Sequence, residues 1–461
     1  MILIHTSSKN LPEKNYLFDV IFNEFLGLQY QLILNEGSDD YAIELMNYKR
    51  LVIKDYFWTN LNSEVNYLSE KHLPPEARFY QNEFSFEPDL PVLYGSTNIR
   101  RTPEGIECEI DIFATVYFYL TKWEEYISTD RDGIGRFKLI NSYSYKNNLV
   151  HRPVVNEYVE LLWNMLLYLD GSLTRKQRKY NPVITHDIDQ PFKLYNLESF
   201  ARSFLRNLIK TKDYWNALRD IFVFPLNVFT TKYDVGNSYN FLMDASESIN
   251  AKSYFFFMNS PKTKYDYGYS IEMPFVKQIL NEIKSRDHII GYHPGFHTLE
   301  NPDSWRKGYE GLCAQINKKI YDGRQHYLRF DIPNSWQFCE DNGLQTDYTL
   351  GFAEVEGFRC GTCYEYSVYN FLNRKKLKLK ESPLILMDVS ISEYQGIRHP
   401  EEYIKKLNNI ITVVKRYSGN FGLLWHNAVF NQVLYTRKFY KRIIESIAVN
   451  LIHIISFILA W

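Results

Sequence analysis

The sequence predicts an α/β protein with a deformed (β/α) barrel of about seven strands in its C-terminal part and an α+β accessory domain before it. After residue 180, short apolar runs alternate with amphipathic helical segments, which is the pattern of parallel strands joined by helical crossovers. Residues 1–175 lack this alternation and mix short strand-like runs with helices. A chain of 461 residues, 45% hydrophobic and 23% charged, is long enough for two globular domains.

The N-terminal region contains two clear helical segments. One runs from about residue 111 to 126, and the other follows Pro153 with an apolar stripe at helical spacing. The strand-like runs are 2–5, 31–34 and 51–53. A polar and basic stretch at 171–180 is the best candidate for a linker, so we expect an accessory domain over 1–175 and the barrel over 180–446.

The elements of the barrel region follow in a regular order. The predicted strands are 181–184, 253–258, 288–292, 326–330, 347–351, 357–359, 384–388 and 421–425. The predicted helices are 239–249, 271–286, 301–320, 335–342, 400–416 and 432–446. A helical insertion at 213–229 is interrupted at Pro225. In barrels of this kind, the chemistry lies at the C-terminal ends of the strands.

Composition and termini narrow the class of protein. A net charge of −1 gives no reason to expect a nucleic-acid partner. The N-terminus lacks the regions of a signal peptide, and five cysteines do not make a disulfide framework, so a cytoplasmic protein is expected. Residues 447–461 are apolar but too short for a firm membrane span, and we expect a closing helix or a tail there in preference to a membrane anchor.

Two acidic residues follow the first strand of the barrel region. Asp187 and Asp189 occupy positions i and i+2 of an extended segment, so their side chains point the same way. Two carboxylates this close do not both ionise without a cation or a proton between them. Polar turns after strands also contain such pairs, so this stretch alone leaves both a turn and a metal site open.

Two histidines follow a later strand. His293 and His297 are four residues apart and can converge on one metal if the loop turns helically through Pro294 and Gly295. Together with an acid from the earlier strand end they make an Asp/His/His set. Such a set is a three-ligand catalytic site with an open position for water.

Two further places at strand ends carry polar residues. Arg359 can orient a carboxylate and hold it ionised. The neighbouring Cys360 and Cys363 are expected to be packing residues in preference to a redox pair or a zinc site. Asp388 and His426 each end an apolar strand, and the histidine can be a general acid that the aspartate tunes. Supporting or substrate contacts are expected from His326, Arg329 and Asp347.

In this order, the motifs resemble those of the polysaccharide deacetylase family, which is carbohydrate esterase family four with its NodB-homology domain. The likeness covers about residues 180–445 and rests on an Asp strand end, His-x-x-x-His, an Arg strand end, a second Asp strand and Leu-x-His. Residues 185–189 and 357–363 look like a Bacteroidetes-type branch of the family. That branch carries an N-terminal domain of unknown function, which would match residues 1–175.

The resemblance implies a metal-dependent deacetylase that removes an N- or O-acetyl group from a sugar. Asp187 would be the general base, oriented by Arg359, and His426 would be the general acid, tuned by Asp388. The metal ligands would be Asp189, His293 and His297. The metal would be zinc in most cases, with cobalt, nickel or manganese as alternatives.

Three positions depart from the family pattern. Ile188 separates two acids that are adjacent in the family, which leaves the division between base and ligand open. Gly361 stands where the family has a proline, which affects the backbone donor to the oxyanion. The stretch 388–390 lacks the tryptophan that walls the acetyl pocket, so the acetyl group would be held differently or the substrate would not be an ordinary N-acetyl sugar.

The sequence thus predicts a deacetylase that acts on an acetylated carbohydrate, such as a lipid-linked or nucleotide-linked unit of a surface polysaccharide. One alternative is a barrel that binds glycan without turning it over. A second alternative is a metal-dependent hydrolase of another C–N bond, in a cyclic or other small amide. Metal content separates the first alternative from the prediction, and a substrate panel separates the second.

Overall fold

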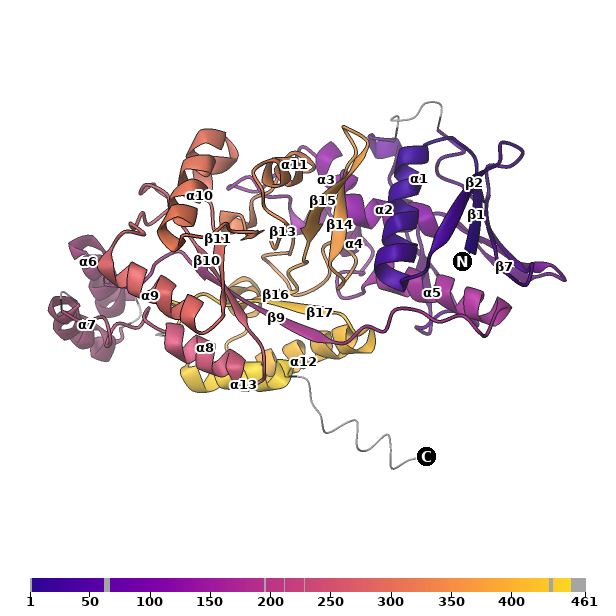
Figure 1. Cartoon of the computed structure of the whole chain (residues 1–461). Helices are drawn as coiled ribbons and strands as arrows, with labels where there is room; N and C mark the ends of the chain where they lie inside the picture. The colour runs from indigo at the N-terminus through magenta and orange to yellow at the C-terminus, as the bar shows by residue number, and fades with distance from the viewer. Residues whose placement is uncertain are drawn as a thin grey trace.

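The structure is a computed structural model that describes residues 2–61, 67–194, 196–210, 212–227, 229–430 and 434–448. It contains a six-stranded sheet in the N-terminal part, a nine-stranded sheet in the C-terminal part and a two-stranded ribbon (Figure 1). The predicted mixed α/β character with parallel strands is confirmed. In Figure 1 the N-terminal sheet lies at one end of the molecule, and the nine-stranded sheet occupies the middle.

The N-terminal sheet has the strand order β2-β1-β3-β4-β8-β7 and mixes parallel with antiparallel pairs. Its strands are β1 (Ile2–Thr6), β2 (Tyr30–Leu34), β3 (Tyr41–Glu44), β4 (Arg50–Ile53), β7 (Gly95–Arg101) and β8 (Gly105–Ile110). The ribbon consists of β5 (Arg78–Tyr80) and β6 (Leu90–Val92). The longer helices of this part are α1 (Leu11–Phe18), η1 (Asp19–Leu26), α2 (Ile112–Thr121) and α5 (Val154–Leu169).

The helix predicted over residues 111–126 is interrupted. Helix α2 ends at Thr121, Lys122 adopts a left-handed conformation with φ 53°, and α3 (Trp123–Ile127) follows. Asp111 caps α2, because its side chain accepts a hydrogen bond from the backbone N–H of Ala114 at 2.9 Å. The helix predicted after Pro153 is confirmed as α5.

The nine-stranded sheet has the order β14-β15-β13-β12-β11-β10-β9-β17-β16. Its strands are β9 (Asn181–Ile188), β10 (Ser253–Phe257), β11 (Ile289–Tyr292), β12 (Asp322–Gly323), β13 (Thr346–Asp347), β14 (Tyr366–Asn370), β15 (Lys375–Glu381), β16 (Leu386–Met387) and β17 (Asn420–Leu424). All neighbours are parallel except β14 and β15. Strand β9 lies between β10 and β17 and is buried after its first residue. Its C-terminal end, which carries Asp187, therefore lies in the interior of the sheet.

A closed barrel is not shown, because β14 and β16 form two edges of this sheet within the described residues. The segment between β15 and β16 nevertheless bonds to two parts of the chain whose strands are far apart in the sheet: the residues after β13, and β17. The backbone N–H of Leu384 donates to the carbonyl of Leu350 at 3.1 Å, and that of Ile385 donates to Gly422 at 3.0 Å. This segment therefore brings β16 beside β17.

The helices of this part agree with the predicted ones: α8 (Tyr239–Glu247), α9 (Pro274–Ser285), α10 (Pro302–Ile316), α11 (Asn334–Asp341), α12 (Pro400–Arg416) and α13 (Arg437–Ile447). Two predicted strands are wrong. Residues 326–330 begin with the 3-10 helix η6 (His326–Leu328), because strand β12 is short and ends at Gly323. Residues 357–359 form a turn in which Gly357 has φ 146°. The hairpin of β14 and β15 was not predicted.

The two parts of the chain share one hydrophobic core. The predicted linker at 171–180 is packed against the N-terminal part, since Arg178 donates to the carbonyl of Glu24 at 2.7 Å and lies over the ring of Tyr364. The five cysteines are free, and burial raises the pKa of Cys360 and Cys363 to about 12, which agrees with a packing role.

The C-terminal prediction for 447–461 falls mostly outside the described residues, which end at 448. Among the residues that are described, no helix is both long and apolar enough to cross a membrane.

Candidate active site

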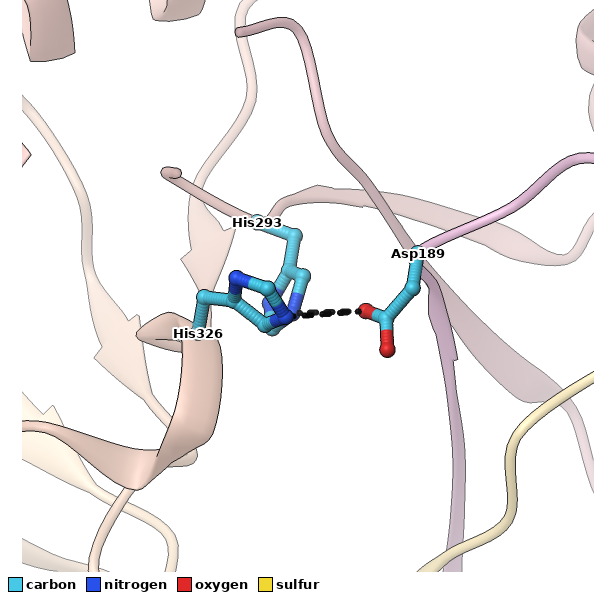
Figure 2. Close-up of side chains that lie close together, drawn as sticks. All are labelled: Asp189, His293 and His326. Carbon is cyan, nitrogen blue, oxygen red and sulfur yellow. Dashed lines mark ion pairs between the residues drawn. The ribbon is translucent and has the colours of Figure 1, made fainter. Parts of the chain in front are cut away.

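Asp189, His293 and His326 come together at the C-terminal ends of β9, β11 and β12 (Figure 2). The Nε2 atoms of His293 and His326 lie 3.3 and 3.6 Å from Oδ1 of Asp189. One potential ligand atom from each residue lies within 4.8 Å of the other two. Both histidines are buried, and Asp189 is partly exposed.

Nδ1 of each histidine has a hydrogen-bond partner in the protein. Nδ1 of His293 donates to the carbonyl of Arg324 at 2.7 Å, and Nδ1 of His326 lies 2.8 Å from Oδ1 of Asp266. These bonds occupy Nδ1 and aim each Nε2 at Asp189. A carbonyl or carboxylate partner behind each histidine is the usual support of a metal-ligating imidazole.

The electrostatics of the cluster favour a positive charge at its centre. Burial opposes ionisation of Asp189, but His326 and His293 hold the pKa of its carboxyl well below the usual range. Burial also opposes protonation of His326, yet Asp189 and Asp266 raise its pKa to about 9. A bound cation would take the place of that Nε2 proton.

Two buried atoms of the cluster have no hydrogen-bond partner among the described residues: Oδ1 of Asp189 and Nε2 of His293. Unpaired buried polar atoms are rare and call for a ligand. A carboxylate and two imidazoles are also a common ligand set of catalytic zinc. The residues present therefore fit a divalent metal ion, and Asp189, His293 and His326 form a possible metal site.

Asp187 lies next to this cluster and is paired with an arginine. Nη1 of Arg324 is 3.0 Å from Oδ1 of Asp187 and 2.7 Å from the hydroxyl of Thr185. The guanidinium is buried, and its Nε also donates to the carbonyl of Tyr348 at 2.9 Å. Oδ2 of Asp187 lies 3.7 Å from Nε2 of His293. Both acids of the β9 end thus face the same histidine, as their i, i+2 spacing predicted.

His426, which follows β17, lies on the other side of Asp189, with its Nε2 3.8 Å from Oδ2. Its Nδ1 is 3.0 Å from Oδ1 of Asp388, and Oδ2 of Asp388 accepts the backbone N–H of His426 at 2.8 Å. Burial alone would lower the pKa of His426, but Asp388 and Asp189 raise it to about 10. The imidazole is therefore held in its protonated form.

The sequence predicted His297 as the third metal ligand, but His297 does not lie in this cluster. Gly295 has an extended backbone (φ −65°, ψ 166°), so the loop does not turn helically between His293 and His297. The i, i+4 geometry of a helix does not apply, and the exposed His297 ring lies beside Tyr265 and Phe296. His326 occupies the third position in its place.

Arg359, which was expected to orient Asp187, is instead paired with Glu125 of α3. Its Nε and Nη2 lie 3.0 and 2.6 Å from the two carboxylate oxygens, and both side chains are buried. Lys122 donates to the carbonyl of Arg359 at 2.9 Å. The cause is the turn at 357–359, which carries the side chain toward the N-terminal part. Arg324 makes the contact with Asp187 that Arg359 was expected to make.

Sequence reasoning ranked His326 only as a supporting residue and did not name Arg324. A signal was present, because residues 322–326 are a polar run that follows a short apolar segment. The strand β12 within it has two residues, too few for a period-two pattern to be visible.

A pocket of about 300 Å³ opens beside the cluster and is lined by Asp189 but not by His293 or His326. The chemically active groups in its wall are Asp187, Asp189 and His426, and Tyr267 and Asn427 also line it. Three basic side chains also line it: Lys193, Arg202 and Arg206.

A family model matches residues 2–170, and it describes a family of unknown function (DUF7033). That match lies in the N-terminal part and does not include the cluster of acids and histidines. No curated protein sequence matches the chain significantly.

Several solved structures show a weak likeness to the chain. A protein described as a polysaccharide deacetylase from Mycobacterium smegmatis is 15% identical with a TM-score of 0.38, over 59% of this chain and 85% of that chain. One from Pseudomonas aeruginosa is 10% identical with a TM-score of 0.37, over 58% and 84%. The allantoinase Puue is 11% identical with a TM-score of 0.39, over 58% and 84%. A likeness of this degree does not establish a common activity.

Proposed function

We propose that the chain is a metal-dependent deacetylase that hydrolyses an N- or O-acetyl group on a sugar, as a step in surface polysaccharide metabolism. The observation that carries the proposal is that an arginine-paired carboxylate and a carboxylate-paired histidine lie beside an Asp/His/His cluster. Hydrolysis of an acetyl group requires a Lewis acid, a base and an acid, and these groups supply the three parts.

Asp189, His293 and His326 would hold the metal, with zinc as the first candidate and cobalt, nickel or manganese as alternatives. When bound at such a site, a divalent metal polarises the acetyl carbonyl and lowers the pKa of water. Asp189 is the better-placed acid for this role, because it lies closer to His293 than Asp187 does, at 3.3 against 3.7 Å.

Asp187 is the general base. Its carboxylate takes a proton from the water whose oxygen attacks the acetyl carbon, and the guanidinium of Arg324 orients it. His426 is the general acid. It gives its proton to the amine or alcohol as the bond from the acetyl carbon to nitrogen or oxygen breaks, and Asp388 keeps it protonated until then. The products are acetate and the free sugar amine or alcohol.

The experiment is acetate release from N-acetylated and O-acetylated sugars, with a cyclic amide as the alternative substrate. Protein stripped of metal and protein reloaded with zinc are compared. We expect acetate from at least one acetylated sugar, only with metal, and loss of this activity in Asp187→Asn and His426→Gln. Turnover of the cyclic amide alone would favour a hydrolase of another C–N bond, and binding of sugar without turnover by the loaded protein would favour a glycan-binding barrel.

A further inference from the structure

An apolar helical hairpin projects from the molecule beside the pocket. It consists of α6 (Leu197–Leu205), η4 (Arg206–Lys210) and α7 (Tyr214–Leu226), inserted between β9 and α8. Figure 1 shows α6 and α7 at the end of the molecule opposite the N-terminal sheet. We call these residues, 197–226, the α6–α7 hairpin.

The outer surface of the α6–α7 hairpin is unusually apolar. Of the 26 large apolar side chains that are exposed in the described chain, ten lie in this hairpin. On α7, Trp215, Leu218 and Phe222 form one stripe at helical spacing, and Trp215 is 82% exposed. A concentration of exposed apolar side chains of this kind marks an interaction site.

The interior of the hairpin contains polar side chains where the helices meet. Asp220 is fully buried and accepts hydrogen bonds from the hydroxyl of Ser203 at 2.6 Å and from the amide of Asn207 at 2.9 Å. The contact between the helices thus contains buried polar side chains as well as apolar ones, while many large apolar side chains face outward. That arrangement is unfavourable in water and favourable at the boundary between lipid headgroups and acyl chains.

The charge of the hairpin indicates which surface it fits. Its basic residues are Arg202, Arg206, Lys210, Lys212 and Arg219. Its acidic residues are Glu198, Asp213 and the buried Asp220. The hairpin therefore carries a net charge of +2, from five basic and three acidic residues, in a chain whose net charge is −1. Apolar residues flanked by lysines and arginines are the composition of a helix that lies on an anionic membrane.

Residues of the α6–α7 hairpin also line the active-site pocket. Arg202 and Arg206 line the same pocket as Asp189 and His426. Lys193, which also lines the pocket, has a buried Nζ with no hydrogen-bond partner among the described residues, and burial lowers its pKa to about 8. A buried, unpartnered ammonium beside two guanidinium groups fits an anionic oxygen group such as phosphate.

We propose that the α6–α7 hairpin docks on a membrane that contains anionic lipids and presents the pocket to molecules held in that membrane. The substrate class that follows, which rests on the proposed function, is an acetylated sugar attached to a lipid through phosphate. The phosphate binds between Lys193, Arg202 and Arg206, while the acetyl group reaches Asp187 and His426.

Docking is tested by sedimentation of the full-length protein with vesicles of phosphatidylcholine, with and without phosphatidylglycerol. We expect binding that requires phosphatidylglycerol and weakens as salt rises. Trp215→Ser/Phe222→Ser should lower the affinity roughly tenfold or more, because two large apolar side chains no longer enter the interface. Tyr48→Ser is the matched control, since Tyr48 is 83% exposed on the N-terminal part, and it should bind as the parent does.

The electrostatic contribution is tested with Lys210→Gln/Lys212→Gln, which should lower affinity for the anionic vesicles by roughly tenfold or more. Lys375→Gln/Lys378→Gln removes two exposed lysines from β15 and should have no effect. Absence of binding by the parent protein, or equal binding by Trp215→Ser/Phe222→Ser, would overturn docking. A dimer that forms in solution through the hairpin and ignores vesicles would also overturn it and would assign the surface to a second copy of the chain.

The substrate class is tested with one acetylated sugar in two forms, as a lipid phosphate and as a neutral glycoside. The phosphate form should be hydrolysed roughly tenfold or more faster at low substrate, and Arg202→Gln should reduce this preference. Equal hydrolysis of both forms would overturn the inferred substrate class and leave the deacetylase proposal standing. Vesicle binding without hydrolysis of either form would support docking and count against the deacetylase proposal.

Discussion

Nη1 of Arg324 lies 3.0 Å from Oδ1 of Asp187, in a contact between two buried side chains. The carbonyl of the same arginine accepts a hydrogen bond from Nδ1 of His293 at 2.7 Å. One residue thus orients both the carboxylate that we assign as base and a histidine that we assign as metal ligand. This relationship makes Arg324 the positioning residue of the site.

Replacing Arg324 by glutamine should reduce turnover by a factor on the order of 10–100, since Asp187 loses the ion pair that holds it in place. Metal content, measured by mass spectrometry, should be retained because the backbone carbonyl that supports His293 remains. Arg324→Lys should recover part of the turnover, as it restores the charge without the planar fork. Unchanged turnover in Arg324→Gln, with folding confirmed by thermal denaturation, would contradict the assignment.

The two candidate histidines can be compared directly. His326→Ala should lose bound divalent metal and turnover together, because it removes one of three ligands. His297→Ala should retain metal, because that ring is exposed and lies outside the cluster. Metal retained in His326→Ala but lost in His297→Ala would show that the loop after β11 rearranges to place His297 at the metal.

Asp187→Asn should keep metal and lose turnover, because it removes the base and leaves the three proposed ligands in place. Asp189→Asn should lose both, since an amide oxygen is a much weaker ligand than a carboxylate. Metal titration followed by acetate release measures the two properties separately. Equal metal loss in both variants would mean that Asp187 is a ligand as well, and the division of roles between the acids would be wrong.

The pair of His426 and Asp388 predicts a pH dependence. The acid must be protonated to act, so activity falls as pH rises through the pKa of His426, which the neighbouring carboxylates raise to about 10. Asp388→Asn removes the nearest of these charges, lowers that pKa and should move the basic limb of the kcat/KM profile down by roughly one pH unit or more. An unmoved basic limb would exclude His426 as the acid.

The contact of Arg359 with Glu125 predicts an effect on stability. Arg359→Gln leaves the buried carboxylate of Glu125 with a weaker set of partners and should cost about 3–5 kcal/mol of unfolding free energy. The double variant Glu125→Gln/Arg359→Gln should recover part of that loss, because neither charge is then unpaired. Chemical denaturation measures both. A stable Arg359→Gln that has lost turnover would instead support the role in orienting the base that the sequence suggested.

Much of the fold was predictable because its helices and longer strands have strong periodic patterns. Helix α12 begins at Pro400 and ends at Arg416 as predicted, since a proline at its start and an amphipathic stripe define it locally. Strands β12 and β13 have only two residues each. The hairpin of β14 and β15 joins the sheet by pairing with β13, whose residues are distant from it in the sequence. The order of the strands in the sheet depends on such long-range pairing, which no local pattern reports.

The site was predictable where a residue's position follows from a strand end. Asp187, Asp189 and His293 come directly at or after β9 and β11 and meet as their spacing suggested. His297 and Arg359 were misplaced because their positions depend on loop conformation, at Gly295 and at the turn beginning with Gly357. Loop conformation is set by tertiary contacts, and for Arg359 the decisive contact is Glu125, 234 residues away in the chain.

The most direct test of the central claim is the anomalous X-ray scattering of crystals of the zinc-loaded protein, recorded on both sides of the zinc absorption edge. The account predicts one strong anomalous peak bounded by Asp189, His293 and His326, with Asp187 held by Arg324 beside it. A zinc peak elsewhere, or a peak ligated by His297 in place of His326, would contradict the assigned site. No peak at saturating zinc would contradict the metal-dependent mechanism itself.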